Sequence, residues 1–310
     1  AYRADANLVE LIRLTDFSDK GSTGITNIER ATRILDNGTI IGTGRTAGDA
    51  IHVVQLTPIA TELSWDANGS TSGLPQGSGT WSHSSGNWTV NTAGTSASGW
   101  TDGAIAKFYY NNLPSTLTVT DNITLEGLWT GYTPNGMTID ASGGGLTFTG
   151  QGFIRTSGSP SFLKISAPIG GSAGLWITGN GGGVTLESAN TYTGLTRIDY
   201  QNDLVVGHAG ALGASGAGNE TQVDSGGYLG FAISETTNET MILNGGGIYV
   251  VPDYGSSTLR QVDLAGPVVL QEHSALGGSR PDFNASMTVS GVISETGGAR
   301  NLVVWGATLT

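Results

Sequence analysis

The sequence predicts an all-β protein in which a right-handed parallel β-helix, a solenoid over residues 65–310, follows a small N-terminal arm of mixed helix and strand over residues 1–64. Three observations lead to this fold class. Short apolar runs recur about every 8–12 residues after Trp65, as in all-β architectures. Turn-forming clusters separate these runs, and the 310 residues include 50 glycines. The helix signals are confined to the N-terminal arm.

The N-terminal arm is expected to contain one or two short helices. Leucine and isoleucine have helical spacing in residues 8–12, which indicates a short amphipathic helix. Thr26 and Glu29 have the spacing of a capping box, which predicts a second helix at about residues 27–37. Two strands are expected after this helix, in the runs TIIGTG and AIHVVQL.

The stretch GGVTLESANTYTGLTRIDYQNDLVVG, residues 182–207, carries three short strands without a helix between them. If the three strands make one coil of roughly 20–25 residues, each strand pairs in parallel with its equivalent about 4.8 Å above it. Sharp corners then replace crossover helices. The inward residues of the three strands are Val184 and Leu186, Thr196 and Ile198, and Leu204 and Val206.

Two stretches of this region carry a family resemblance. SANTYTGLTRIDYQNDLVVGHAGALG at residues 188–213, followed by VDSGGYLGF at residues 223–231, resembles the autotransporter passenger-associated strand repeat. The resemblance implies a parallel β-helix that is secreted or exposed at a cell surface, and it implies no particular activity. Residues 201–203 depart from the repeat, because Gln-Asn-Asp stands where the family usually has Gly-Thr before the leucine. This corner is therefore expected to be rebuilt.

The turn motif of the resemblance is interpreted as structural. Tyr192 is expected to cover the corner of the next coil, and stacking of a ligand on its ring is the alternative. The motif residues are Asn190, Thr191, Tyr192, Thr193 and Gly194.

A cluster of tryptophans is interpreted as an N-terminal cap over residues 65–110. It is expected to plug the first coil, whose strand edges would otherwise invite aggregation, and carbohydrate stacking is the alternative. The residues are Trp65, Trp81, Trp88 and Trp100.

Composition excludes several classes of protein. The net charge is −12 and the pI is about 4.5, so binding to nucleic acid is not expected. Without cysteine there are neither disulfides nor thiolate metal sites. No run of about 18 apolar residues is present to span a membrane as a helix, and residues 1–30 contain no signal-peptide apolar core.

The enzyme signatures are weak, and the protein is predicted to have no enzymatic activity, no cofactor and no metal. Ser172 lies in a Gly-x-Ser-x-Gly match and residues 42–48, GTGRTAG, loosely resemble a dinucleotide loop, but neither has the expected context. Asp140 and Asp253 are possible oxygen ligands for calcium, without a regular repeat. The histidines are scattered without metal-ligand spacing: His52, His83, His208 and His273.

Acidic residues pose the one serious catalytic question. A β-helix that cleaves polysaccharides needs two carboxylates roughly 5–9.5 Å apart. Asp199 with Asp203, or Asp224 with Glu235, are the candidate pairs.

The favoured function is a non-enzymatic, surface-exposed structural or adhesive β-helix of the autotransporter-passenger kind, extracellular or on a bacterial surface. The alternative is a bacteriophage virion protein, a capsid decoration or tail fibre, anchored by residues 1–64 and exposed on the virion. Three features favour this alternative: the absence of a visible signal peptide, an Ala1-Tyr2 start that fits methionine removal, and the expected helix-bearing arm. A glycan depolymerase is the lesser alternative.

The expected partners are other chains at residues 1–64 and at the C-terminal edge, in a possible homotrimer, and surface glycans.

Overall fold

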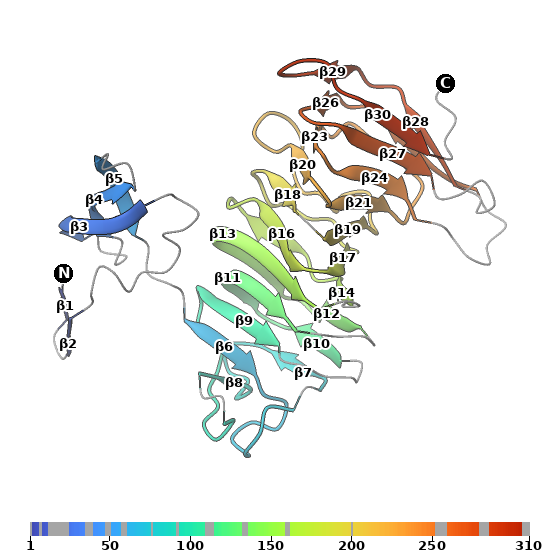
Figure 1. The fold of residues 1–310 in the computed structure, drawn as a ribbon. Helices are drawn as coiled ribbons and strands as arrows, with labels where there is room; N and C mark the ends of the chain where they lie inside the picture. Colours follow the sequence, from blue (N-terminus) through green and yellow to red (C-terminus); the bar gives the residue numbers. More distant parts are fainter. Residues whose placement is uncertain are drawn as a thin grey trace. The chain divides into compact units, whose positions relative to one another are not determined.

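Figure 1 shows the fold of the chain in a computed structural model. The structure describes residues 2–5, 8–11, 25–34, 40–46, 51–56, 61–75, 77–90, 93–108, 115–131, 136–158, 162–199, 201–251, 259–278 and 285–305. The chain forms two compact units, Ala1–Ala60 and Thr61–Thr310. All of the regular elements in the described residues are strands.

The first unit contains two small antiparallel arrangements. β1 (Tyr2–Asp5) pairs with β2 (Leu8–Leu11), and β3 (Ile25–Ile34), β4 (Ile40–Thr46) and β5 (Ile51–Leu56) form a three-stranded sheet. The two strands predicted after residue 37 are confirmed as β4 and β5. The helices predicted at residues 8–12 and 27–37 are wrong, because residues 8–11 and 25–34 are strands.

The physical reason for the second error lies in the register of β3. Three bulges interrupt its pairing with β4, after Ile25, Ile28 and Ala31. Each bulge inserts one unpaired residue, so that the paired positions Ile25, Ile28, Ala31 and Ile34 recur every third residue. The spacing of three, between Ile28 and Ala31 and between Thr26 and Glu29, also fits a helix with a capping box, and this is why the sequence indicated one.

The second unit is a parallel β-solenoid, which confirms the predicted fold class. Two long sheets run along it, and their strands stack coil upon coil in Figure 1. Sheet I has ten strands, in the order β7 (Gly79–Trp81), β10 (Ser115–Val119), β12 (Met137–Ala141), β14 (Phe162–Ile165), β17 (Gly182–Leu186), β19 (Asn202–Val206), β21 (Tyr228–Phe231), β24 (Gly247–Val250), β27 (Ser274–Gly278) and β30 (Leu302–Trp305).

Sheet II has twelve strands and sheet III has three. Sheet II runs β8 (Trp88–Thr89), β6 (Glu62–Trp65), β9 (Ala104–Phe108), β11 (Asn122–Thr130), β13 (Gly145–Ser157), β16 (Leu175–Asn180), β18 (Thr196–Ile198), β20 (Thr221–Asp224), β23 (Met241–Asn244), β26 (Val268–Leu270) and β29 (Ile293–Glu295), with β15 (Ile169–Gly171) beside β13. Sheet III consists of β22 (Glu235–Thr237), β25 (Arg260–Leu264) and β28 (Ala285–Val289).

The coil differs in one respect from the prediction. β17 pairs directly with β19, and Leu186 lies opposite Val206, so the third strand of the stretch 182–207 already begins the next coil. The prediction that β17, β18 and β19 make one coil is therefore wrong. The third side of this coil is the segment 189–193, whose backbone bonds run to neighbouring coils, from Thr191 N to Ile169 O (2.8 Å) and from Ala214 N to Tyr192 O (2.9 Å).

Inward-facing side chains alternate along the strands and form the core. β17 buries Val184 and Leu186, and β19 buries Asn202, Leu204 and Val206 in the same rows. One tight position shows how closely the coils approach. At Gly179, where φ is 133°, an added Cβ would lie 1.9 Å from the backbone oxygen of Thr156, so only glycine fits.

We expect Leu186→Ala to lower the free energy of unfolding by about 2–5 kcal/mol, because it removes a fully buried side chain and leaves a cavity between two coils. Chemical denaturation followed by circular dichroism measures this loss. Thr185→Ala, on the outward side of the same strand, is the control and should change stability by less than about 0.5 kcal/mol. Equal effects of the two substitutions would contradict the inward assignment of Leu186.

Candidate functional site

The turn motif at residues 190–194 joins three successive coils. The side chain of Asn190 is buried, its Oδ1 accepts a hydrogen bond from Ile169 N (2.8 Å), and its Nδ2 donates to Ala211 O (2.7 Å). Ile169 belongs to the coil before and Ala211 to the coil after. The Asn190 amide therefore satisfies backbone groups that a strand would otherwise pair.

Tyr192 lies inside the solenoid. Its side chain is 1% exposed, and its hydroxyl is 2.8 Å from Oγ1 of Thr196. An added Cβ at Gly213, in the next coil, would lie 3.1 Å from two ring carbons, so the backbone of that coil covers the ring. Burial raises the pKa of the Tyr192 phenol far above its ordinary value, which keeps the hydroxyl neutral. These contacts support the structural interpretation over ligand stacking.

The other motif residues frame this corner. Thr191 and Thr193 point to solvent on either side of Tyr192. Gly194 has a φ of 99°, and its N–H donates to Oδ1 of Asn219 (2.8 Å).

The corner that departs from the family repeat is held by two unusual residues. Gln201 has a φ of 61°, a left-handed conformation that favours glycine. The next residue, Asn202, is fully buried, and its Oδ1 accepts a hydrogen bond from Oγ1 of Thr156 (2.9 Å). A buried amide thus lies opposite Gly182 in the register of β17 and β19.

The four predicted cap tryptophans pack against one another at the β6–β8 end of the solenoid. All four are buried, and neighbouring ring centroids are 4.8–5.4 Å apart, mostly edge to face. β8 joins β6 in antiparallel orientation, whereas β6 and β9 are parallel. Because the rings are buried, a sugar cannot stack on them in this arrangement.

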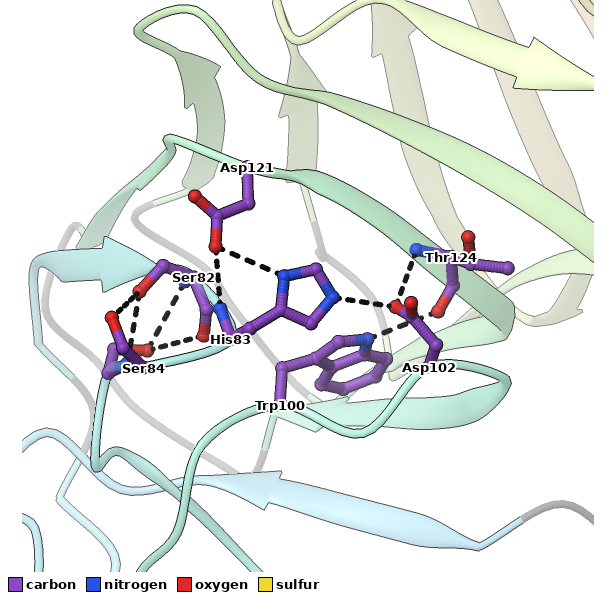
Figure 2. A network of polar contacts seen from close by, with 8 residues as sticks. Ser82, His83, Ser84, Trp100, Asp102, Asp121 and Thr124 are labelled. Carbon is purple, nitrogen blue, oxygen red and sulfur yellow. Dashed lines mark hydrogen bonds and ion pairs between the residues drawn. The ribbon is translucent and has the colours of Figure 1, made fainter.

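A polar network lies beside this cap (Figure 2). The ring of His83 lies between two carboxylates, with Nδ1 3.1 Å from Asp121 Oδ2 and Nε2 3.0 Å from Asp102 Oδ1. Asp102 also accepts the backbone N–H of Thr124, and Trp100 Nε1 donates to the Thr124 carbonyl (3.1 Å). The network clamps together three loops that are distant in sequence.

The contacts of the network indicate a structural role, in which His83 holds the loops together. The hydrogen bond to Asp102 raises the pKa of His83, so the clamp is strongest with a protonated ring and weakens as the pH rises past this raised pKa. Both ring nitrogens of His83 face carboxylates. The hydroxyl of Ser82 contacts Ser84 and Ser85 instead of the imidazole, so His83 does not activate it as a nucleophile.

The members of the two candidate carboxylate pairs singled out in the sequence do not contact each other in the described residues. None of the contacts of the described residues joins Asp199 to Asp203 or Asp224 to Glu235. Instead, the charge of Asp224 acts on Asp199, and burial is the main cause that raises the pKa of Asp199. Asp199 and Asp224 are the neighbouring acidic pair of this face.

Both members of this pair are held by donors from adjacent coils. Asp199 Oδ2 accepts hydrogen bonds from Trp176 Nε1 (3.1 Å) and Thr178 Oγ1 (3.0 Å). Asp224 forms an ion pair with Arg197 (2.5 Å) and accepts hydrogen bonds from Gln222 (2.7 Å) and Asn244 (2.8 Å). Carboxylates with this many donors hold the coils of sheet II together.

The remaining candidates are apart from one another. Ser172 is exposed in the bend between β15 and β16, and Asp140 Oδ1 accepts the N–H of Ala141. Nδ1 of His208 and Nδ1 of His273 each accept a backbone N–H, from Gly210 (3.0 Å) and Asn301 (2.8 Å). Asp253, and residues 47–48 of the GTGRTAG run, lie outside the described residues, while residues 42–46 of that run lie in β4.

Sequence reasoning missed the buried acid Glu239. Glu239 is 4% exposed and accepts a hydrogen bond from Oγ1 of Thr221 (3.0 Å), and burial raises its pKa to about 7. Burial also raises the pKa of Glu235 to about 7. The alternation of SETTNET is a signal that could have placed Glu239 inward, in step with Thr237.

A second missed feature is the outer face of sheet II. Trp129 lies between two cations from the adjacent strands, with Lys107 Nζ 4.3 Å and Arg155 Cζ 4.8 Å from its ring centroid. Further along, Arg197 Cζ lies 5.5 Å from the centroid of Trp176. Trp129 lies between the buried Leu128 and Thr130, and Trp176 lies between the buried Leu175 and Ile177, so both tryptophans occupy outward positions.

Across the part of the chain that the structure describes, no group of three or more acidic or histidine side chains could hold a metal ion. The same residues contain no helix that is long and apolar enough to cross a membrane.

We expect Asn190→Ala to lower the free energy of unfolding by about 2–5 kcal/mol, since it leaves a buried N–H and a buried C=O without partners, at about 1–3 kcal/mol each. Thermal or urea denaturation measures the loss. Asn190→Asp keeps the acceptor for Ile169 and loses the donor to Ala211, while exposed Thr191→Ala is the control. A tolerated Asn190→Ala would show that the amide does not hold the corner.

We expect stability to fall as the pH rises from about 4.5 to about 7, because Glu239 stays protonated in the folded chain over this range and ionises in the unfolded chain. Its contribution to this fall is up to ~3 kcal/mol. Glu239→Gln should reduce the fall in denaturation curves recorded between pH 4.5 and 8, and the exposed Glu295→Gln should leave it unchanged. An unaltered pH profile for Glu239→Gln would contradict the assignment.

Comparison with known proteins finds a similarity to an autotransporter adhesin. No protein-family model matches the chain, and no solved structure matches it. The chain is 30% identical, over 182 residues, to an adhesin autotransporter, BmaC, from Brucella suis biovar 1 (strain 1330). The similarity covers 57% of this chain and 5% of the Brucella protein, so the chain spans about a twentieth of the length of the relative it matches. The expectation of a passenger-like β-solenoid is therefore consistent with both the observed fold and the similarity to this adhesin.

Proposed function

We propose that this chain is part of a surface-exposed, non-enzymatic adhesive protein, in which the solenoid serves as a rigid stalk that carries contact residues on its outer faces. The observation that carries the proposal is a parallel β-solenoid together with similarity to an autotransporter adhesin. The location that follows is the cell surface or the extracellular medium.

The construction of the solenoid supports a stalk. Each coil pairs through its backbone with the coils before and after it, so the stack extends along one axis and resists bending. The interior rows are filled by side chains such as Leu204 and Leu229, which are fully buried. Contact with a partner thus falls to the outward residues.

The alternatives receive less support. The virion alternative rested partly on a helix-bearing arm, and the described parts of that arm are strands. The depolymerase alternative needs two carboxylates that are free to act on a sugar. Asp199 and Asp224 are instead engaged by Trp176, Thr178, Arg197 and other neighbours.

The proposal predicts that the protein is found on intact cells of the bacterium that carries its gene and that the solenoid promotes attachment. Antibodies against residues 61–305 should label intact cells. Deletion of these residues should reduce attachment to host-cell layers several-fold, while the Thr185→Ala strain should attach like wild type. Labelling of wild-type cells only after lysis would overturn the surface location, and unchanged attachment of the deletion strain would overturn the adhesive role.

A further inference from the structure

The outer face of sheet I carries exposed aromatic side chains in one register row. Phe162, Gly183, Asp203 and Tyr228 lie opposite one another on the adjacent strands β14, β17, β19 and β21. The Phe162 side chain is 55% exposed and that of Tyr228 is 46% exposed. We call these four residues the Phe162–Tyr228 strip.

The strip has no side chain at Gly183. An added Cβ there would meet Phe162 Cδ1 at 3.9 Å and Asp203 Cβ at 4.0 Å, which is ordinary contact, and the backbone has no left-handed φ. Neither space nor conformation therefore requires glycine, although glycine weakens a strand. The missing side chain leaves a gap between the ring of Phe162 and the side chain of Asp203, in which a single added carbon would make ordinary contacts.

Polar groups border this gap on the side of Tyr228. Tyr249 packs edge to face with Tyr228, with centroids 6.4 Å apart, and its ring lies over Gly230. Burial, and then the charge of Asp203, raise the pKa of Tyr249, so its hydroxyl is neutral and lies within electrostatic reach of the carboxylate. A hydrogen-bond acceptor, Asp203, thus lies between the two exposed rings, and a donor, Tyr249, lies beyond Tyr228 on β24.

We propose that the Phe162–Tyr228 strip binds a neutral glycan chain, which stacks sugar rings on Phe162 and Tyr228 and forms hydrogen bonds with Asp203 and Tyr249. This inference rests on the proposed adhesive function and names its ligand class. The C–H face of a sugar packs on an aromatic ring, while its hydroxyls donate to a carboxylate. Neighbouring strands are about 4.8 Å apart, so the two rings are roughly 14 Å apart, a span suited to an oligosaccharide.

Charge and width favour this ligand over others. The cation on these four strands is Lys164, and it is paired with Glu187 (2.9 Å), so the strip offers little to an anionic glycan. A protein partner needs about 800 Å² on each side in a standard interface. Four residues in a single row are far narrower than that.

The test uses the purified chain and immobilised neutral hexasaccharides, namely cellohexaose, maltohexaose and chitohexaose, with a heparin hexasaccharide as the anionic probe. We expect binding to at least one neutral probe, measured by biolayer interferometry. Phe162→Ala and Tyr228→Ala should each weaken it about tenfold. Gly183→Thr should weaken it similarly, by filling the gap, while the melting temperature is kept or raised because threonine favours strands.

Val90→Ala, which removes an exposed apolar side chain elsewhere on the unit, is the matched control and should bind like wild type. No binding to any neutral probe, binding to heparin alone, or full binding by Gly183→Thr would each overturn the inference. Attachment of intact cells that persists in the Phe162→Ala, Tyr228→Ala double variant would also overturn this site, while leaving the adhesive function in place.

Discussion

The structure depends on the pairing of each strand with its equivalent in the next coil. Parallel partners place like beside like, so that Val184 stacks on Leu204 and Leu204 on Leu229. Every inward position therefore belongs to a row that runs through several coils. One misplaced polar group affects both neighbouring coils, and the buried side chains of Thr156 and Asn202 are hydrogen-bonded to each other.

Side chains replace the backbone ladder where the chain turns a corner. Asn190 bonds to backbone groups of the coils on both sides, and Asp224 collects donors from Arg197 and Asn244 on the two adjacent strands of sheet II. These side chains link adjacent coils, as backbone pairing does along the strands. It follows that a conspicuous carboxylate or amide in such a repeat is most simply explained by the corner that it completes.

The short strands together with the quasi-repeat of residues 182–207 predicted the solenoid, and the Asn-Thr-Tyr-Thr-Gly turn led to the interpretation of a structural corner. The errors come from features that depend on register. In β3, apolar residues recur at every third position, and bulges accommodate this spacing in a strand. Residues 189–193 form one side of a coil although they lack regular strand pairing. The pairing of Asp199 with Asp224 could not be predicted, because it requires knowing which residues of coils 25 residues apart lie side by side.

The two long sheets differ in what they leave open to a partner. On sheet II, cations of neighbouring strands lie over Trp129 and Trp176, and those cations have partners of their own, such as Glu62 for Lys107 and Asp224 for Arg197. On sheet I, Phe162 and Tyr228 keep about half of their surface exposed, with glycines between and beside them. The interior fixes the register on both sheets equally. The fold therefore does not require the exposed aromatic residues of sheet I, which leaves recognition of a ligand as the explanation for them.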